Sequence, residues 1–227
     1  MKVAALISGG KDSVYAILKE IEKGDEVTCL ISILPDNEES YMFHAYNTRF
    51  VSLISESMGI PLITRKSNGV KEEELKDLKI AVTSALKKYE FEGIVSGTIE
   101  SNYQRDRLED IFKDMRIELI LPLWKKDPEL LLRNMYRVMD IIIVHVSALG
   151  LDQSFLGKKI DDDLFSMLKE LNTKYRVHIC GEGGEYETFV IDTTLFNKRI
   201  DITDGIIKWN GSYGTFIIKN ARLVEKR

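Results

Sequence analysis

The sequence predicts an α/β fold, in which a doubly wound parallel sheet of five strands is followed by a smaller mixed α/β domain. Three observations support this class. In the first half, apolar runs alternate with segments of helical periodicity, as they do in βαβ units. A glycine pair separates the first apolar run from the first helical segment. In the second half, shorter apolar runs are joined by turn residues, which is typical of a β-rich domain.

The first half contains the repeated strand and helix patterns. Apolar runs lie at residues 3–7, 27–34, 60–63, 93–96 and 117–121. Helical stripes between them consist of Val14, Ile17, Leu18 and Ile21, then Phe50, Leu53, Ile54 and Ser57, then Leu75, Leu78, Val82 and Leu86, and finally Leu108, Ile111, Phe112 and Met115. Right-handed crossovers place helices on both faces of such a sheet, and its ligands bind beyond the carboxyl ends of the strands.

The second half has a different order of elements. We expect a helix at about 128–139, a strand around 141–144, a glycine-rich stretch at 150–161 and a helix with Leu164, Leu168 and Leu171 on one face. Strands are expected at 188–191, 206–209 and 215–218, with turns at Asp204-Gly205 and Asn210-Gly211. We place a domain boundary near residue 125, which divides the chain into domains 1–125 and 126–227.

Composition limits the classes of function. The 227 residues are 44% hydrophobic and 30% charged, as in soluble globular proteins. No apolar run approaches the roughly 20 residues that span a bilayer, and the N-terminus lacks a signal-peptide pattern. The two cysteines lie far apart, so we expect a cytoplasmic protein without a disulfide framework. A net charge of −4 argues against a stable nucleic-acid partner. The β-rich end is a candidate edge for a homodimer.

The string SGGKDS at residues 8–13 is the strongest local signal. A glycine loop between a strand and a helix offers backbone N–H groups and the positive end of a helix dipole to a phosphate. The loop is too short for a Walker A motif. Asp12 beside a polyphosphate indicates an intervening Mg²⁺ ion. The residues expected to hold the phosphates are Ser8, Gly9, Gly10, Lys11, Asp12 and Ser13. The alternative is an ordinary turn in which Ser8 or Asp12 caps the helix.

Two further segments follow predicted strands. The stretch 40–49 contains His44, which is either a ligand-binding or a packed polar residue. The stretch 97–109 begins with Gly97 and Thr98, at the place where a nucleotide base or ribose would lie. Arg105 and Arg107 diverge by about 200° on a helix, so one of them faces a ligand. We favour Arg105.

The segment at 180–190, CGEGGEYETFV, places Glu182, Glu185 and Glu187 around a glycine pair. Like charges repel each other, so a site for ammonium, Mg²⁺ or a cationic substrate group explains their concentration better than a structural turn does. A solvated acidic hairpin is the alternative. Cys180 is expected in the core rather than as a nucleophile.

SGGKDS resembles the pyrophosphate loop (PP-loop) of the ATP pyrophosphatases, whose domains have an adenine nucleotide alpha-hydrolase-like fold. Together with SYMFHAY (40–46), GTIESNYQRDRLE (97–109), PLW (122–124), GLDQSFLGKKID (150–161) and CGEGGEYETFV (180–190), it makes the chain similar to the diphthine–ammonia ligase (diphthamide synthetase) family. The resemblance implies adenylation of the diphthine carboxylate on elongation factor 2. Ammonium then replaces AMP to give diphthamide.

The resemblance implies ATP and Mg²⁺ as cofactors and assigns roles to single residues. Those assigned to catalysis are Lys11, Asp12, Glu182, Glu185 and Glu187, with Asp12 also a metal ligand. Those assigned to the nucleotide are residues 8–13, His44, Gly97, Thr98 and Arg105. Two other functions stay open: a PP-loop ligase or pyrophosphatase that acts on a small metabolite or a tRNA base, and an ATP-binding sensor without catalysis.

Overall fold

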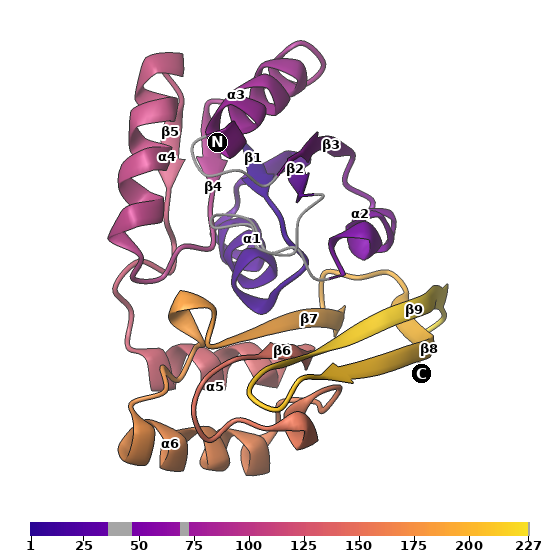
Figure 1. Cartoon of the computed structure of the whole chain (residues 1–227). Coiled ribbons are helices and arrows are strands. Elements are labelled where there is room, and N and C mark those ends of the chain that lie inside the picture. The colour runs from indigo at the N-terminus through magenta and orange to yellow at the C-terminus, as the bar shows by residue number, and fades with distance from the viewer. Residues whose placement is uncertain (36–46, 69–72, 227) are drawn as a thin grey trace. The chain divides into compact units, whose positions relative to one another are not determined.

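The computed structural model describes residues 1–35, 47–68 and 73–226 (Figure 1). The chain divides into two compact units, Met1–Trp124 and Lys125–Arg227. Within the described ranges, no helix combines the length and the apolar character that a bilayer crossing requires. Each unit has its own sheet, and each is described separately below.

The sheet of the first unit is parallel, as predicted. Its strands are β1 (Lys2–Leu6), β2 (Glu26–Pro35), β3 (Leu62–Ser67), β4 (Gly93–Val95) and β5 (Glu118–Ile120). They lie in the order β3-β2-β1-β4-β5. The order reverses direction between the neighbours β1 and β4, which makes the carboxyl ends of these two strands the place where such sheets bind ligands.

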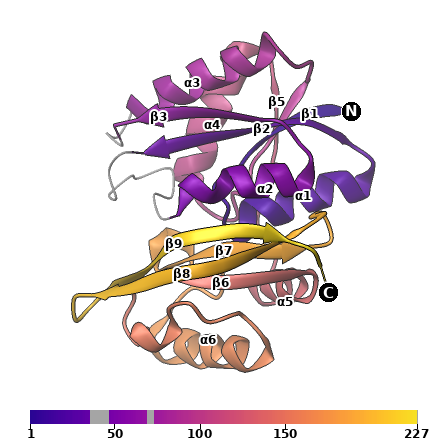
Figure 2. The same ribbon diagram turned by 90° about the vertical axis from the view of Figure 1, so that its right-hand side faces the viewer.

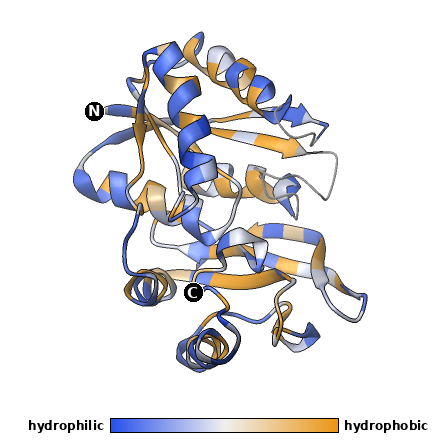
Figure 3. Cartoon of the chain, turned by 60° about the vertical axis from the view of Figure 1, so that its left-hand side comes forward, coloured by the Kyte–Doolittle hydropathy of each residue, from blue (hydrophilic) through white to orange (hydrophobic). Residues whose placement is uncertain are grey.

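Helices cover both faces of this sheet, so the predicted doubly wound fold is confirmed. Figure 2 shows α3 (Glu73–Leu86) and α4 (Asn102–Met115) on one face and α1 (Lys11–Lys23) and α2 (Val51–Met58) on the other. In Figure 3 the strands are largely hydrophobic, whereas the helices alternate between hydrophobic and hydrophilic residues. The core beneath α3 and α4 includes Ala4, Cys29, Ile31, Ile33, Leu78, Val82, Ile94, Leu108 and Phe112.

For one residue of the predicted helical stripes, the prediction of burial is wrong. Leu86, the last residue of α3, is 40% exposed, and Ala85 is buried in its place. The helical period continues through Ala81 and Ala85, whose small side chains gave no hydrophobic signal strong enough to compete with leucine.

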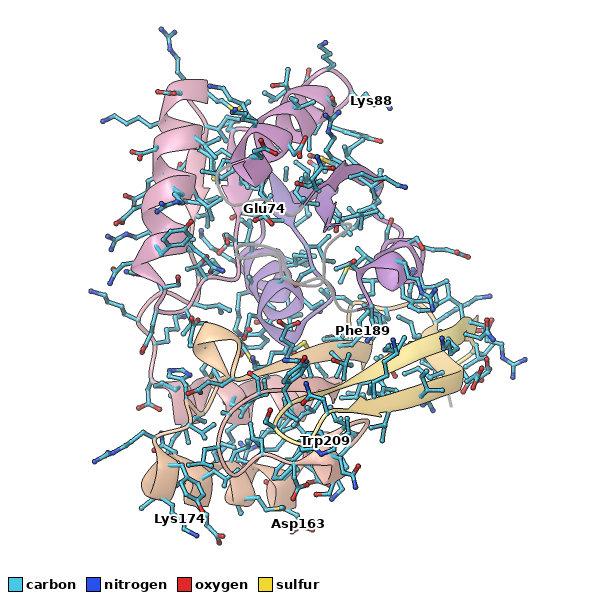
Figure 4. The ribbon with its side chains drawn as sticks, viewed as in Figure 1. Glu74, Lys88, Asp163, Lys174, Phe189 and Trp209 are labelled. Carbon is cyan, nitrogen blue, oxygen red and sulfur yellow. The ribbon has the colours of Figure 1, made fainter. Side chains whose placement is uncertain are left out.

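The second unit is a four-stranded antiparallel sheet with two helices. After α5 (Pro128–Val138) come β6 (Met139–Val146), α6 (Asp162–Tyr175), β7 (Tyr186–Thr193), β8 (Arg199–Trp209) and β9 (Gly214–Val224), and the strand order is β7-β6-β9-β8. Asp161 caps α6 by accepting a hydrogen bond from the Leu164 N–H. Asp163 and Lys174 lie at opposite ends of this helix (Figure 4). The helix dipole favours an acidic residue at the N-terminal end and a basic residue at the C-terminal end, which is where the two residues lie.

The expected turn at Asp204-Gly205 is wrong, because β8 runs through both residues. The pairing of β8 with β9 shifts register on both sides of Asp204, so the two residues form a bulge. A Cβ atom on Gly205 would lie 2.6 Å from the Phe216 ring, which explains the glycine. The turn at Asn210-Gly211 is confirmed: Gly211 has φ 97°, and the Asn210 side chain accepts hydrogen bonds from the N–H groups of Ser212 and Tyr213.

Candidate functional site

The loop between β1 and α1 leaves the start of the helix open toward a ligand. Gly10 occupies the N-cap position and has no side chain to cap the helix. Neither Ser8 nor Asp12 caps it, so the ordinary-turn interpretation is not supported. The N–H groups of the first turn have no carbonyl one turn earlier in the helix to bond with. Gly9 has φ 87°, a conformation that other residues rarely adopt.

The two serines of the loop hold its shape. Ser13 Oγ donates to the Gly10 carbonyl at 3.0 Å and also lies 3.3 Å from both the Ser8 N–H and the Ser8 Oγ. The Gly10 N–H is 3.3 Å from Ser8 Oγ. These long contacts are weak, so the serine hydroxyls and the Gly10 N–H can be turned to phosphate oxygens at little cost.

Lys11 and Asp12 form an ion pair, with Lys11 Nζ 2.9 Å from Asp12 Oδ2. Lys11 is only 2% exposed, so it is not the mobile charge that a lysine in a loop suggests. The other carboxylate oxygen, Asp12 Oδ1, is buried without a hydrogen-bond partner among the described residues. A buried carboxylate oxygen is costly unless something pairs with it, and a cation would do so.

The loop after β4 touches the start of α1. A Cβ atom on Gly97 would lie 2.6 Å from the Asp12 carbonyl carbon and from the Ser13 nitrogen, so only glycine fits. Beside it, the hydroxyls of Ser96 and Thr98, both buried, are 2.9 Å apart. The structure therefore brings Gly97 to the SGGKDS loop, and the role of Thr98, the next residue along the chain, stays a prediction. Ser96 was not foreseen, although it is the first polar residue after a fully apolar strand.

Both arginines of α4 contact side chains of their own unit. Arg105 Nε lies 2.9 Å from Asp106 Oδ1, and its guanidinium lies 4.9 Å from the centre of the Trp124 ring. Arg107 stacks on Tyr103 at 3.5 Å. The role of Arg105 toward a nucleotide stays a prediction. His44 and the SYMFHAY string lie outside the described residues.

The acidic segment of the second unit is a tight turn built on three glycines. Gly181, Gly183 and Gly184 all have positive φ, between 70° and 77°. A Cβ atom on Gly181 would collide with Tyr186, 2.6 Å from its carbonyl oxygen, whereas Gly183 and Gly184 face open space. The Tyr186 hydroxyl donates to the Ile179 carbonyl and closes the turn.

Two of the three glutamates of this turn have different neighbours. Glu185 accepts a hydrogen bond from the His178 N–H through Oε2, so its carboxylate fastens the turn. Glu187 lies on β7 opposite His145 of β6. No group of three or more acidic, histidine or cysteine side chains in the described part of the chain is placed to hold a metal ion.

His145 and His178 both lie at this turn, which the sequence did not indicate. His178 Nδ1 lies 3.1 Å from the Cys180 N–H and 3.4 Å from the Glu182 N–H, so it acts as an acceptor. Cys180 is buried and its thiol donates to the Pro128 carbonyl. The thiol thus packs in the core, as expected.

The first unit has the architecture of a nucleotide-phosphate-binding α/β protein of the PP-loop class: an uncapped helix start behind a glycine loop, at the reversal point of a parallel sheet. Residues 1–119 match the family model of the diphthamide synthase N-terminal domain, and residues 127–224 match that of the C-terminal domain. The chain belongs to the diphthamide synthase family.

Curated relatives agree with this assignment. The chain is 38% identical to the diphthine–ammonia ligase of Rattus norvegicus over 91% of this chain and 85% of the relative, and 39% identical to that of Homo sapiens over 88% and 82%. Among solved structures, a predicted subunit of tRNA methyltransferase from Methanocaldococcus jannaschii overlays with a TM-score of 0.46 at 15% identity, covering 86% of this chain and 98% of that chain. An overlay this loose has no bearing on function.

Proposed function

We propose that this chain is an ATP-dependent diphthine–ammonia ligase. It adenylates the carboxylate of diphthine on elongation factor 2, and ammonium then replaces AMP to form diphthamide. The observation that carries the proposal is the match of both units, one to each domain of the diphthamide synthase family. The relatives named as diphthine–ammonia ligases cover both units as well.

The first unit supplies the phosphate-binding part of the reaction. Attack of a carboxylate on the α-phosphorus breaks its bond to the bridging oxygen and releases pyrophosphate, so negative charge grows on the leaving group. The open N–H groups at the start of α1 and the ammonium of Lys11 stabilise that charge. Such groups act mainly by position, and no protein nucleophile is needed.

The loop also fits the expected metal. Mg²⁺ prefers phosphate oxygens together with one or two carboxylates, and Asp12 Oδ1 is a buried carboxylate oxygen without a hydrogen-bond partner in the described ranges. Asp12 would hold the ion, which would neutralise charge on the polyphosphate. Gly97 leaves the first turn of α1 open by keeping side-chain atoms away from it.

We assign substrate recognition and ammonium binding to residues 126–227. Glu187 is proposed to bind the cation, and Glu185, which also fastens the turn through its hydrogen bond from the His178 N–H, is proposed to lie beside it. A role of the Glu182 carboxylate in ammonium binding is part of the same proposal. We also propose a cytoplasmic location, because the proposed substrate acts in translation and both cysteines are free thiols.

The test measures AMP and pyrophosphate with elongation factor 2 that carries diphthine, with and without ammonium. We expect AMP to depend on the protein substrate and the amide to depend on ammonium. AMP formed only with a small metabolite or a tRNA would assign the chain to another ligase. ATP binding with no AMP under any condition would make it a sensor.

A further inference from the structure

A buried hydroxyl group of the first unit lacks a hydrogen-bond partner. Ser32 lies on β2 and is 1% exposed, and its Oγ atom makes no hydrogen bond within the described parts of the chain. A buried polar group without a partner lowers the stability of a fold, because it has lost its hydrogen bonds to water. Alanine would fill nearly the same space without that cost. Folding alone therefore does not explain a serine at this position.

Ser32 lies beside the start of the glycine loop. β1 and β2 pair in parallel with Leu6 opposite Ile31, and the Ile7 N–H donates to the Ile31 carbonyl at 2.9 Å. The next pair in this register is Ile7 with Ser32. Neighbouring strands are about 4.8 Å apart, so Ser32 is next to the point where β1 ends and the SGGKDS string begins.

The Ser32 side chain projects from the face of the sheet that carries α1. Its neighbours along the strand, Ile31 and Ile33, belong to the core beneath α3 and α4. Successive side chains of a strand point to opposite faces, so Ser32 is directed to the face that α1 and α2 cover (Figure 2). The glycine loop leads into α1 on this same face. The hydroxyl and the loop therefore lie on one side of the sheet.

Asp12 in the first turn of α1 carries a second atom of this kind. Its Oδ1 is also buried and lacks a hydrogen-bond partner in the described ranges. Two such oxygen atoms at one edge of the sheet indicate a polar ligand there. The loop can make room for it at little cost, because the contacts from the Ser8 N–H to Ser13 Oγ and from the Gly10 N–H to Ser8 Oγ are as long as 3.3 Å.

The chemistry of a hydroxyl favours the nucleoside part of ATP over its phosphates. Phosphate oxygens without a proton only accept hydrogen bonds, and the N–H groups at the start of α1 are the donors for them. A serine hydroxyl both donates and accepts, as do the ribose hydroxyls and the adenine edge that joins an amino group to a ring nitrogen. Ser32 lies opposite Ile7, whereas α1 begins further along the chain at Lys11, so the hydroxyl is set back from the helix start.

We propose that Ser32 is a nucleotide-binding residue whose hydroxyl contacts the nucleoside part of ATP. This assignment rests on the proposed ligase function and on its use of ATP. The hydroxyl finds its hydrogen-bond partner only in the nucleotide complex, so the serine lowers the stability of the free chain and strengthens binding. A nucleoside held in this way fixes the position of the α-phosphorus for attack by the substrate carboxylate.

The experiment makes two measurements on Ser32→Ala in the full chain: unfolding by urea without nucleotide, and the affinity for α,β-methylene-ATP, an analogue that is not cleaved between the α and β phosphates. We expect the urea midpoint to rise, because the unpaired hydroxyl is gone. The affinity should fall by about 2- to 12-fold, the range for one hydrogen bond between uncharged groups. A serine with a structural role would instead lower the midpoint.

The matched control is Ser55→Ala on α2. The Ser55 hydroxyl donates to the Ile60 carbonyl at 2.6 Å, so it already has its partner within the fold. Its removal should lower the urea midpoint and leave the affinity for the analogue at the parent value. The two serines thus have opposite expected effects on stability, and only Ser32 affects binding.

Pyrophosphate separates the nucleoside from the phosphates, since it has phosphates alone. Its competition with the analogue should be equal in the parent chain and in Ser32→Ala. Pyrophosphate binding that weakens as much as analogue binding would assign the hydroxyl to the phosphates and overturn the nucleoside contact.

A parent-like affinity of Ser32→Ala for the analogue, or a urea midpoint that does not rise, would overturn the role of Ser32. The parent chain is titrated first. If it does not bind the analogue, the ATP-dependent function itself fails. If the parent binds and Ser32→Ala binds equally well, only the assignment of Ser32 fails.

Discussion

The two carboxylate oxygens of Asp12 have different environments: Oδ2 pairs with Lys11, whereas Oδ1 has no hydrogen-bond partner within the described residues. We predict that Asp12→Ala abolishes substrate-dependent AMP formation and leaves the fold intact. Loss of one preorganised charge-stabilising group typically costs about 10²- to 10³-fold, so the isosteric Asp12→Asn should lose at least about 100-fold.

The matched control is Asp114→Asn, an exposed aspartate on α4. It should keep the parent rate, and circular dichroism should report native helix content for all three variants. Near-normal AMP formation by Asp12→Ala would remove Asp12 from the site.

Cys29 is fully buried in β2, and burial raises the pKa of its thiol to about 11. The thiolate is the reactive form, so the folded protein should react with a thiol reagent very slowly at neutral pH, and faster only as the pH rises toward 11. The measurement uses Cys180→Ser, which leaves Cys29 as the single thiol. Urea should expose it to fast labelling. Fast labelling of the folded chain at neutral pH would contradict this burial.

At the scale of elements, the pattern of apolar residues predicted those features that depend on residues close together in the sequence. Strands and helices of the first unit follow their apolar periods, and SGGKDS lies where a strand meets a helix. The sequence predicts a turn where the bulge at Asp204 lies, because an Asp-Gly pair is compatible with both and only the pairing with β9 decides between them.

Some residues of the candidate site could be predicted from the sequence, and others could not. Gly97 follows a strand end, so its place beside the loop could be expected. The place of His145 beside the acidic segment depends on antiparallel pairing with a strand some 40 positions later in the sequence, whereas His178 lies only two residues before Cys180. A hairpin turn would fix the register of two strands, but α6 lies between β6 and β7 in the sequence, so no turn indicates this pairing.

The turn at residues 181–186 yields a prediction that separates structure from catalysis. Glu185 accepts the His178 N–H, so Glu185→Ala leaves that donor without its partner. A hydrogen bond to a charged group is worth about 1.5–3 kcal/mol, and the free energy of unfolding in urea should fall by about that amount. The control Glu170→Ala, at an exposed position of α6, should change it by less than about 0.5 kcal/mol. Unchanged stability of Glu185→Ala would mean that the carboxylate serves another role.

At the scale of the whole molecule, each unit contains one of the two tryptophans, Trp124 in the first and Trp209 in the second. We predict that a non-hydrolysable ATP analogue stabilises the first unit, by about 2.7 kcal/mol at 100 times its dissociation constant. Unfolding of Trp209→Phe, followed through Trp124, should shift to higher denaturant. A shift seen only through Trp209 in Trp124→Phe would place the nucleotide in the second unit.

Homodimer formation stays a prediction at this scale as well. β8 is an outer strand of its sheet, and Ile206 and Ile207 on it are 39% and 49% exposed. Unpaired outer strands can pair with a second chain. Light scattering of the parent and of Ile207→Lys would test this: a dimer through β8 should dissociate in the variant, and a monomeric parent would exclude it.

The contact of Gly97 with the backbone of residues 12 and 13 also has a consequence for synthesis on the ribosome. The first turn of α1 emerges early, but its neighbour in the finished sheet is made some 85 residues later, and non-local contacts of this kind form late. A nascent chain that ends before β4 has the glycine loop without the strand beside it. The nascent chain would then bind the nucleotide only after translation has passed residue 97. The loop would be among the first segments synthesised and among the last to become able to bind its ligand.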